Sequence, residues 1–342
     1  MTTTPTLSER TTLRVGGPAR AWIVAESEAD LVDAVRALDA AGEPVLLLGG
    51  GSNLVVSDSG FAGTVVEIAT RGADAQVVDD RVLLTLAAGE PWDDIVSRAV
   101  AHGWAGIEAL SGIPGLVGAT PVQNVGAYGQ DVGQVVTAVR ALDRSSGEVS
   151  DMSGADCGFG YRTSLFKRQP DRWVVLSVTI SLAAGGRGTV GYAELAASLG
   201  VPVGGEADIS AIRGAVLALR ARKGMVLAEH DHDTWSAGSF FTNPVVDAAV
   251  AEALPHDCPR YPSDRGVKVS AAWLIEQSGV GRGFALPSSR AAISGKHTLA
   301  LTNRGGATTA EIADLARAVR STVLDRFAIE LTPEPVLVGL SL

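Results

Sequence analysis

The sequence predicts a mixed protein of the α+β class, and three observations support this prediction. Segments of helical and of strand character alternate near the start of the chain, and later segments are less regular. A long stretch rich in glycine and proline lies between them. The length, 342 residues, allows two or three domains. We therefore expect α+β domains rather than one doubly wound sheet.

The composition indicates a globular protein with an ample core. Hydrophobic residues make up 46% of the chain and charged residues 19%, unlike a disordered chain. The formal net charge of −10 disfavours non-specific nucleic-acid binding, although local arginines can still bind a small anion. The first residues lack the pattern of a signal peptide, and no apolar stretch approaches the ~18 residues of a membrane span. We expect a cytoplasmic monomer that contacts neither nucleic acid nor membrane.

The first part of the chain contains signals for helices and strands in alternation. Ser27 is placed to cap a helix over residues 28–41, and Gly42 ends it. Pro91 opens a second helix, in which Trp92 and Ile95 stand at helical spacing. Short apolar runs between these helices predict strands at 45–48, 64–68 and 82–87.

The later elements follow a stretch that no regular element tolerates. Residues 110–133 read LSGIPGLVGATPVQNVGAYGQDVG, and so many glycines and prolines predict a functional loop. Thr308 and Glu311 form the pattern of a capping box that opens a helix reaching about residue 327. We also expect strands at 135–143, 173–182 and 336–340, and helices at 209–220 and 270–277.

The run LLLGGGSN, residues 46–53, contains consecutive glycines whose backbone N–H groups can bind a phosphate. The lysine of a P-loop is missing, which excludes a Walker A motif. The chain continues into another apolar run rather than a helix, which disfavours a Rossmann site. The motif is either a pyrophosphate cradle of another class or a simple tight turn.

Three further segments suit either a ligand or a purely structural role. Small residues in SGIPGLVGATPVQNVGAYG, residues 111–129, allow a flat ring to lie against the backbone, unless the segment is a self-packed Ω loop. Arg162, in CGFGYRTSLFK, is costly among apolar neighbours unless it pairs with an anion or forms a structural salt bridge. Glu334, in LTPEPVLVG, is either functional or an exposed loop carboxylate.

Two groups of residues raise the question of a metal site. Cys157 and Cys258 lie far apart and lack metal-ligand spacing, so we expect buried thiols. Asp231, His232 and Asp233 could hold a metal, but charge runs are usually solvated. We therefore expect a solvated loop there and no metal.

Ser239 lies in SAGSFFTNP, residues 236–244, after two small residues and before two phenylalanines. This pattern is not the G-x-S-x-G elbow of a nucleophilic serine, and no histidine stands beside it. The local residues therefore do not indicate a hydrolase.

Taken in order, five motifs resemble those of the UDP-N-acetylenolpyruvoylglucosamine reductases, also called UDP-N-acetylmuramate dehydrogenases. They are GGGSN, SGIPGLVGATPVQNVGAYG, FGYRTS, AGSFFTNP and the L-x-P-E of residues 331–334. The resemblance covers about residues 12–340. In one departure, Pro335 follows Glu334 where the family commonly has valine.

This resemblance implies a vanillyl-alcohol-oxidase-type two-part FAD-binding domain and a C-terminal α+β substrate-binding domain. It implies non-covalent FAD, NADPH as reductant, and reduction of UDP-N-acetylglucosamine enolpyruvate to UDP-N-acetylmuramate in peptidoglycan synthesis. Hydride from the flavin would reach the methylene carbon of the enolpyruvyl ether, and a side chain would supply the proton.

The same resemblance assigns roles to individual residues. Ser239 would donate the proton, while Arg162 and Glu334 would stabilise the enol-like intermediate. The residues expected to bind FAD are Gly49, Gly50, Gly51, Ser52, Asn53, Pro114, Gly115, Gly118, Ala119, Gln123, Asn124 and Gly126. The residues expected to bind the substrate are Tyr192, Lys223, Asn243, Tyr261, Lys268 and His297.

The resemblance also implies a division into three domains. Residues 1–72 and 73–218 would bind FAD, residues 219–335 would bind the substrate, and the strand at 336–342 would return to the first domain. Two alternatives stay open: an oxidase or dehydrogenase of the same FAD fold acting on another substrate, and a non-catalytic nucleotide-sugar binder. The joint presence of Ser239, Arg162 and Glu334 disfavours both.

Overall fold

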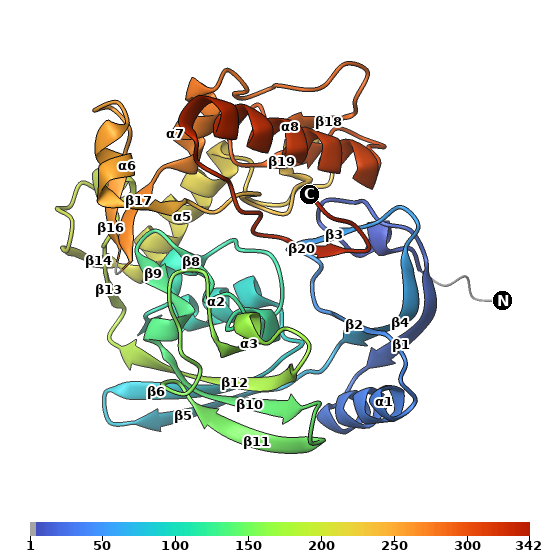
Figure 1. Cartoon of the computed structure of the whole chain (residues 1–342). Coiled ribbons are helices and arrows are strands. Elements are labelled where there is room, and N and C mark those ends of the chain that lie inside the picture. Colours follow the sequence, from blue (N-terminus) through green and yellow to red (C-terminus); the bar gives the residue numbers. More distant parts are fainter. Residues whose placement is uncertain (1–4, 264) are drawn as a thin grey trace. The chain divides into compact units, whose positions relative to one another are not determined.

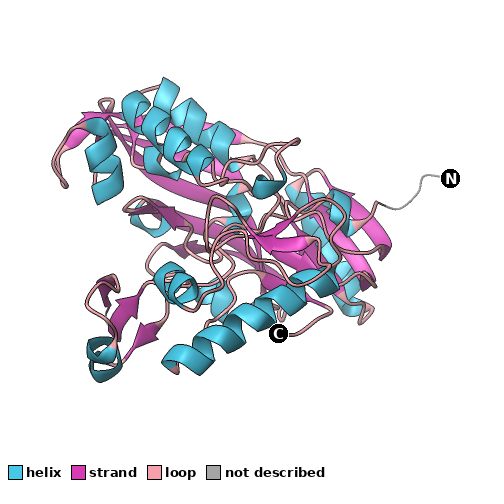
Figure 2. Ribbon diagram, turned by 90° about the horizontal axis from the view of Figure 1, so that it is seen from above, coloured by secondary structure: helices cyan, strands magenta, loops and turns pink. Residues whose placement is uncertain are grey.

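The computed structural model describes residues 5–263 and 265–342, and the chain falls into two compact units. The first unit comprises Met1–Ala19, Gly51–Phe61 and Lys223–Leu342, and the second comprises Arg20–Gly50 and Ala62–Arg222. Residues 1–4 and 264, which belong to the expected domains 1–72 and 219–335, lie outside the described residues. The division into three domains stays a prediction. Figure 2 shows both helices and strands, joined by many loops.

The second unit contains an antiparallel sheet with the strand order β11-β10-β12-β6-β5, in which β7 also pairs with β12 (Figure 1). Its strands are β5 (Ala73–Val78), β6 (Arg81–Ala87), β7 (Trp104–Ala105), β10 (Val136–Asp143), β11 (Glu148–Ser153) and β12 (Trp173–Ala184). In β12, Val178, Ile180 and Leu182 are buried while the residues between them are partly exposed, so one face of the sheet lies on the core. Helix α2 (Trp92–Ala101) contributes Trp92 and Ile95 to the same core.

A smaller sheet with the order β1-β4-β2 packs against helix α1 (Glu28–Ala40), as Figure 1 shows. Its strands are β1 (Ala19–Ala25), β2 (Val45–Leu48) and β4 (Phe61–Ile68), and β2 runs parallel to β4. The Ser27 hydroxyl accepts a hydrogen bond from the Asp30 N–H over 3.1 Å, which caps the helix. Leu31 and Val35 pack with Val66 in a common cluster. The predicted helix, its cap and the strand at 45–48 are confirmed.

The glycine-rich segment forms no long helix or strand, as predicted. It contains 3₁₀ helices at Val117–Ala119 and Val132–Gln134, and a short hairpin of β8 (Gly126–Ala127) and β9 (Gln130–Asp131). A further 3₁₀ turn, Glu108–Leu110, precedes it. The other elements of the unit are α3 (Leu165–Arg168), β13 (Arg187–Thr189), α4 (Ala193–Leu199), β14 (Glu206–Asp208) and α5 (Ile209–Arg222).

The first unit contains segments from both the N-terminal and the C-terminal part of the chain. Strand β20 (Val336–Val338) runs parallel to β3 (Leu54–Val56), and the hairpin of β18 (Ala291–Ile293) and β19 (Leu301–Asn303) packs on helix α8 (Thr309–Phe327; Figure 1). The other elements are 3₁₀ turns at Leu7–Glu9 and His232–Thr234, β15 (Val245–Val246), α6 (Ala248–Ala253), β16 (Arg260–Ser263), β17 (Gly266–Val269) and α7 (Ala271–Gln277).

Helix α8 begins at the predicted capping box. The Thr308 N–H donates to Glu311 Oε2 over 2.7 Å, and the Glu311 N–H donates to Thr308 Oγ1 over 3.2 Å. Each end of the box therefore satisfies a donor that the first helical turn leaves open. Helix α7 starts with a simpler cap, in which the Ser270 hydroxyl accepts from the Trp273 N–H over 3.2 Å. Both predicted helices are confirmed.

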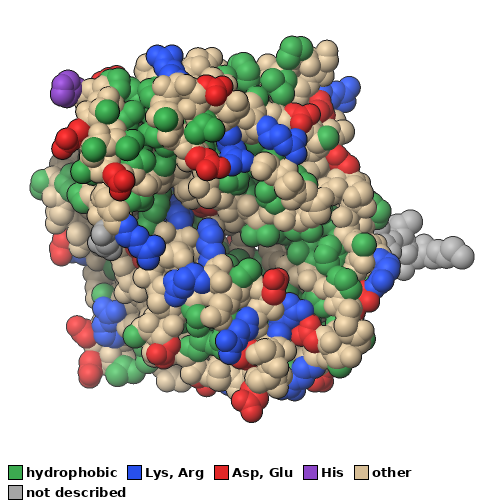
Figure 3. All heavy atoms as spheres, in the orientation of Figure 1, with side chains coloured by type: hydrophobic (Ala, Val, Ile, Leu, Met, Phe, Trp, Pro, Cys, Tyr) green, Lys and Arg blue, Asp and Glu red, His purple; other side chains and the backbone are tan. Residues whose placement is uncertain are grey.

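The surface carries charges of both signs. On the face shown in Figure 3, acidic and basic side chains are interspersed among hydrophobic and uncharged ones. In the part of the chain that the structure describes, no helix is both long and apolar enough to cross a membrane. Nor do residues 5–263 and 265–342 contain a group of His, Cys, Asp or Glu side chains that could hold a metal ion. Cys157 and Cys258 are buried free thiols, as predicted.

Candidate active site

Ser239 lies between a left-handed glycine and two buried phenylalanines of the first unit. Gly238 has a φ of 74°, and its N–H donates to Ser236 Oγ over 3.2 Å. Phe240 and Phe241 are each 1% exposed and meet edge to face, with ring centroids 5.2 Å apart. Ser239 itself is only half-buried. The two rings thus anchor this segment in the core and leave the serine at its accessible edge.

Glu334 is held beside the segment that carries Ser239. The Glu334 N–H donates to the carbonyl of Phe240, the residue after Ser239, over 2.9 Å. On the other side, the Val336 N–H donates to the carbonyl of Asn53 over 2.9 Å. Asn53 Nδ2 donates in turn to the Glu334 carbonyl over 3.4 Å. The first unit therefore brings together three predicted site residues that come from distant parts of the sequence.

Arg162 occupies the tip of a tight turn in the second unit. Gly160 and Thr163 exchange backbone hydrogen bonds of 3.0 and 3.2 Å, which leaves Tyr161 and Arg162 at the tip. Arg162 has a φ of 51°, a left-handed conformation that is uncommon outside glycine. Its Nη2 donates to the carbonyl of Gly126 over 3.0 Å, and the side chain is half-buried. The turn fixes the guanidinium against the predicted flavin segment.

Two glycine loops of the second unit approach each other closely. A Cβ added to Gly50 would lie 2.7 Å from the Cα of Gly115, so no side chain fits there. Gly118 is similarly confined, since an added Cβ would lie 2.6 Å from the Cβ of Ala88. Gly50 and Pro114 are nevertheless exposed. The two loops form a surface of backbone and small side chains that a phosphate or a flat ring can approach.

Some of the remaining residues predicted to bind FAD hold the loops in place, and others are partly exposed. Asn124, with a φ of 48°, accepts from the Gly133 N–H over 2.9 Å and donates to the Gly160 carbonyl over 3.1 Å. Its amide therefore ties the loop to the Arg162 turn. In the first unit, Gly51 has a φ of 60°, and its carbonyl accepts from the Thr12 N–H over 3.1 Å. Gly49, Ser52, Gln123 and Gly126 are half-buried and Ala119 is exposed.

Two carboxylates hold the glycine-rich segment in place, and the sequence analysis did not identify them. Glu108 is fully buried and accepts from the Gly106 N–H over 2.6 Å and from Gln130 Nε2 over 2.8 Å. Asp93 accepts from the Gly112 N–H over 2.6 Å and pairs with Arg213. Burial alone would raise the pKa of Asp93, but the bonds from Arg213 and Gly112 outweigh burial and lower it. The sequence signal was weak, since only the apolar neighbours of Glu108 hinted at burial.

The predicted substrate residues are distributed over both units. In the second unit, Tyr192 meets Tyr128 edge to face, with ring centroids 5.5 Å apart. Burial, together with the charge of Glu194, raises the pKa of Tyr192. In the first unit, Tyr261 and Lys268 are directly paired across β16 and β17, with Lys268 Nζ 5.7 Å from the ring centroid. Asn243 Oδ1 accepts from the Ala271 N–H at the start of α7 over 2.9 Å.

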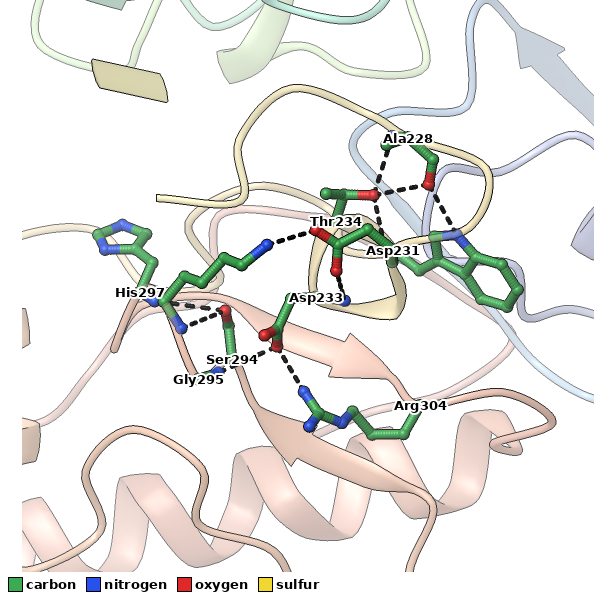
Figure 4. A network of polar contacts seen from close by, with 10 residues as sticks. Ala228, Asp231, Asp233, Thr234, Ser294, Gly295, His297 and Arg304 are labelled. Carbon is green, nitrogen blue, oxygen red and sulfur yellow. Dashed lines mark hydrogen bonds and ion pairs between the residues drawn. The ribbon is translucent and has the colours of Figure 1, made fainter. Parts of the chain in front are cut away.

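The acidic segment after Lys223 is exposed at His232, as expected of a solvated loop, but its two aspartates are also paired with cations. Asp231 pairs with Lys296, and Asp233 pairs with Arg304 and accepts from the Gly295 N–H over 3.0 Å (Figure 4). The hydrogen bond from Lys296 is the main cause that lowers the pKa of Asp231. The sequence did not reveal these two ion pairs, because the cations stand more than sixty positions later in the chain. His297 follows directly after one of these cations.

Comparisons with known proteins match two parts of the chain to known domain families. Residues 19–153 match the model of an FAD binding domain, and residues 230–338 match the C-terminal domain of UDP-N-acetylenolpyruvoylglucosamine reductase. The chain is 53% identical to the UDP-N-acetylenolpyruvoylglucosamine reductase of Saccharopolyspora erythraea, over 98% of this chain and 95% of the relative. It is 51% identical to that of Cutibacterium acnes, over 97% of this chain and 89% of the relative.

The chain belongs to the UDP-N-acetylenolpyruvoylglucosamine reductase family. A solved structure of this reductase from Thermus caldophilus superimposes with a TM-score of 0.67 at 25% identity, and the match covers 98% of each chain. The predicted α+β fold, with a vanillyl-alcohol-oxidase-type FAD-binding part and a C-terminal α+β domain, is confirmed. As a member of the reductase family with an FAD-binding domain, the protein is a flavoprotein oxidoreductase.

The residues of the two glycine loops fit FAD. The FAD-binding match spans both the loop at Gly49–Gly50 and the loop at Pro114–Gly118. Only glycine can occupy position 50, because the backbone of Gly115 passes within contact distance of it. Such close backbone approach, with small residues on the exposed side, suits the pyrophosphate and the flat ring of this cofactor. The loops can therefore hold FAD through backbone groups rather than through a charged side chain.

Proposed function

We propose that this protein reduces UDP-N-acetylglucosamine enolpyruvate to UDP-N-acetylmuramate with NADPH, in the synthesis of peptidoglycan. Membership of the reductase family supports this reaction. The observation that carries the residue assignment is the placement of Glu334 beside Ser239, through the 2.9 Å bond from the Glu334 N–H to the Phe240 carbonyl. The segments that carry Ser239 and Glu334 are joined by this backbone bond, and no histidine stands beside Ser239 in the sequence, which fits proton donation rather than nucleophilic attack.

The proposed reaction transfers one hydride and one proton. When bound, FAD would supply hydride chemistry: it would accept one hydride from NADPH and pass one hydride to the methylene carbon of the enolpyruvyl ether. The electron pair of the double bond moves to the adjacent carbon and delocalises into its carboxylate as an enolate. Ser239 Oγ then donates its proton to that carbon and regains one from solvent, which yields the lactyl ether.

Arg162 and Glu334 complete the surroundings of the enolate in this proposal. A guanidinium presents a planar fork that matches a carboxylate, and Arg162 is already oriented by its bond to Gly126. Glu334 supports the enol form of the same group. The buried rings of Phe240 and Phe241 exclude water on the core side of Ser239, which strengthens electrostatic interactions there.

We assign nucleotide-sugar binding to the six predicted residues Tyr192, Lys223, Asn243, Tyr261, Lys268 and His297. Two of them are lysines, which suit the negative charge of a diphosphate. The paired Tyr261 and Lys268 offer a ring face and a cation at one place. We also retain the three-part division at residues 72 and 218, and a cytoplasmic monomer, as parts of this proposal.

A product assay tests the proposed function. Purified protein loaded with FAD would be mixed with NADPH and UDP-N-acetylglucosamine enolpyruvate in deuterated water, and the product analysed by mass spectrometry. We expect UDP-N-acetylmuramate that carries one solvent deuterium on the carbon next to the carboxylate. A protein that consumes NADPH without forming this product, and passes the electrons to oxygen instead, would support an oxidase acting on another substrate.

A further inference from the structure

The acidic segment before Ser239 has no part in the proposed reaction, yet it is built into the first unit. Its two aspartates contact a second stretch of the chain, residues 294–304 (Figure 4). That stretch contains His297, and the acidic segment leads directly to Ser239. The contact therefore connects two predicted site residues that are far apart in sequence.

The two ion pairs differ in burial. In the pair of Asp231 with Lys296, the side chains are 39% and 36% exposed, and such exposed pairs contribute little. The Asp233 side chain is only 16% exposed and has two donors, Arg304 and the Gly295 N–H at 3.0 Å. A shielded carboxylate that accepts a charge-assisted and a backbone hydrogen bond is held far more firmly. Asp233 is therefore the principal contact.

Asp233 contacts a turn that already has internal order. Ser294 Oγ accepts from the N–H of Lys296 over 3.0 Å and from that of His297 over 3.3 Å. The Gly295 N–H points outward from this turn to Asp233, while the imidazole of His297 points away from both aspartates (Figure 4). The network thus fixes the backbone of the turn that carries His297.

Further contacts connect the residues around Asp233 with the segment of Ser239 and with Gly224, which follows Lys223. The Asn303 N–H donates to the Trp235 carbonyl over 3.0 Å, and the Phe240 N–H donates to the Leu299 carbonyl over 2.7 Å. Gly224 packs so closely that an added Cβ would lie 2.9 Å from the Asp233 carbonyl oxygen. Residues close to Asp233 are therefore in contact with the segment that carries Ser239 and with Gly224, the residue after Lys223.

We propose that Asp233 is a positioning residue, whose carboxylate fixes the turn at residues 294–298 relative to the segment that carries Ser239. It thereby sets the placement of His297 and Ser239 for the enolpyruvyl nucleotide sugar. The kinetic part of this inference rests on the proposed function. The structural part, that Asp233 holds the turn, can be tested without any substrate.

The test uses the full chain loaded with FAD and three variants. Asp233→Ala removes both hydrogen bonds, and Asp233→Asn retains an oxygen that can accept from Gly295. Asp231→Asn is the matched control, because it removes the exposed ion pair but keeps an acceptor for the Asp233 N–H, which now bonds to Asp231 Oδ1 over 3.1 Å. Amide hydrogen exchange of residues 294–298 and the KM and kcat of substrate reduction would be measured for each.

For Asp233→Ala we expect exchange in the turn to accelerate at least about tenfold, and the KM for the enolpyruvyl substrate to rise about tenfold. Flavin reduction by NADPH in Asp233→Ala should change by less than about twofold. In exchange rate and KM, Asp233→Asn should lie between the wild type and Asp233→Ala. Asp231→Asn should resemble the wild type, because the ion pair it removes is exposed. Unchanged exchange in Asp233→Ala would overturn the proposed clamp, and faster exchange with unchanged KM would overturn the positioning role. If the wild type itself forms no product, the proposed function fails, and the exchange data alone decide whether Asp233 holds the turn.

Discussion

At the scale of single residues, the geometry around Ser239 makes a specific kinetic prediction. Its hydroxyl lies at the edge of a segment anchored by two buried rings, next to the strand-like stretch that ends at Glu334. Ser239→Ala should leave flavin reduction by NADPH nearly intact but slow transfer to the substrate by ~100-fold or more, since one positioned proton donor is lost. Stopped-flow absorbance separates the two half-reactions. Ser278→Ala, which removes a hydroxyl that donates to the Leu274 carbonyl over 2.7 Å, is the control.

Equal slowing of both half-reactions in Ser239→Ala would contradict the assignment. It would indicate a general change in the site rather than the loss of a proton. The control variant distinguishes that outcome from a non-specific effect of removing a serine hydroxyl in the same unit.

The second prediction at the residue scale concerns the effect of Arg162→Lys on turnover. The position of Arg162 at the tip of a turn lets Nη2 of the guanidinium bond to the Gly126 carbonyl over 3.0 Å. Arg162→Lys keeps the charge but cannot contact both the Gly126 carbonyl and the substrate carboxylate, so kcat/KM should fall by about tenfold or more. Steady-state kinetics with the enolpyruvyl substrate measure this directly. Wild-type turnover in Arg162→Lys would show that the fork is not needed.

The burial of Cys157 leads us to predict how stability depends on pH. Burial, with a smaller effect of Asp156, raises the pKa of this thiol from 9.0 to about 11. The folded chain keeps a proton that the unfolded chain releases, so stability falls as the pH rises from 9.0 towards 11. At neutral pH the thiol should resist a thiol-specific reagent until the protein is unfolded with denaturant. Rapid labelling of Cys157 in the native protein would contradict this burial.

At the scale of elements, the close approach of the two glycine loops makes a prediction about the cofactor. Gly50→Ala would place a methyl group 2.7 Å from the Cα of Gly115, and backbone atoms cannot move aside as a flexible side chain can. FAD binding should weaken by about tenfold or more, as overpacking typically costs about 1–3 kcal/mol. Flavin fluorescence during titration with FAD measures the change.

The matched control for Gly50→Ala is Gly214→Ala in α5. An added Cβ at Gly214 meets nothing within 4 Å, and the backbone there is helical. Alanine should therefore stabilise the helix by about 0.5–1 kcal/mol and leave FAD binding unchanged. Equal FAD affinity in both variants would show that the loops do not form the cofactor surface.

At the scale of the whole molecule, the sequence predicted those features whose signals are local. The caps at Ser27 and Thr308 lie three residues from the N–H groups they satisfy, so spacing alone reveals them. The ordered motifs predicted the family and its FAD-binding domain. The network of Asp233 could not be predicted, because its partner Gly295 stands 62 positions later. The role of Glu108 was missed for a different reason. A glutamate is usually exposed, and nothing in the sequence showed that this one is fully buried.

The most direct test of the central claim is an anaerobic absorbance titration of the whole protein. The bound flavin would be reduced with NADPH, NADP removed, and UDP-N-acetylglucosamine enolpyruvate added in one equivalent. We expect the oxidised-flavin spectrum to return rapidly as UDP-N-acetylmuramate forms. A flavin that is bleached by NADPH but stays reduced after addition of this substrate would contradict the proposed reaction.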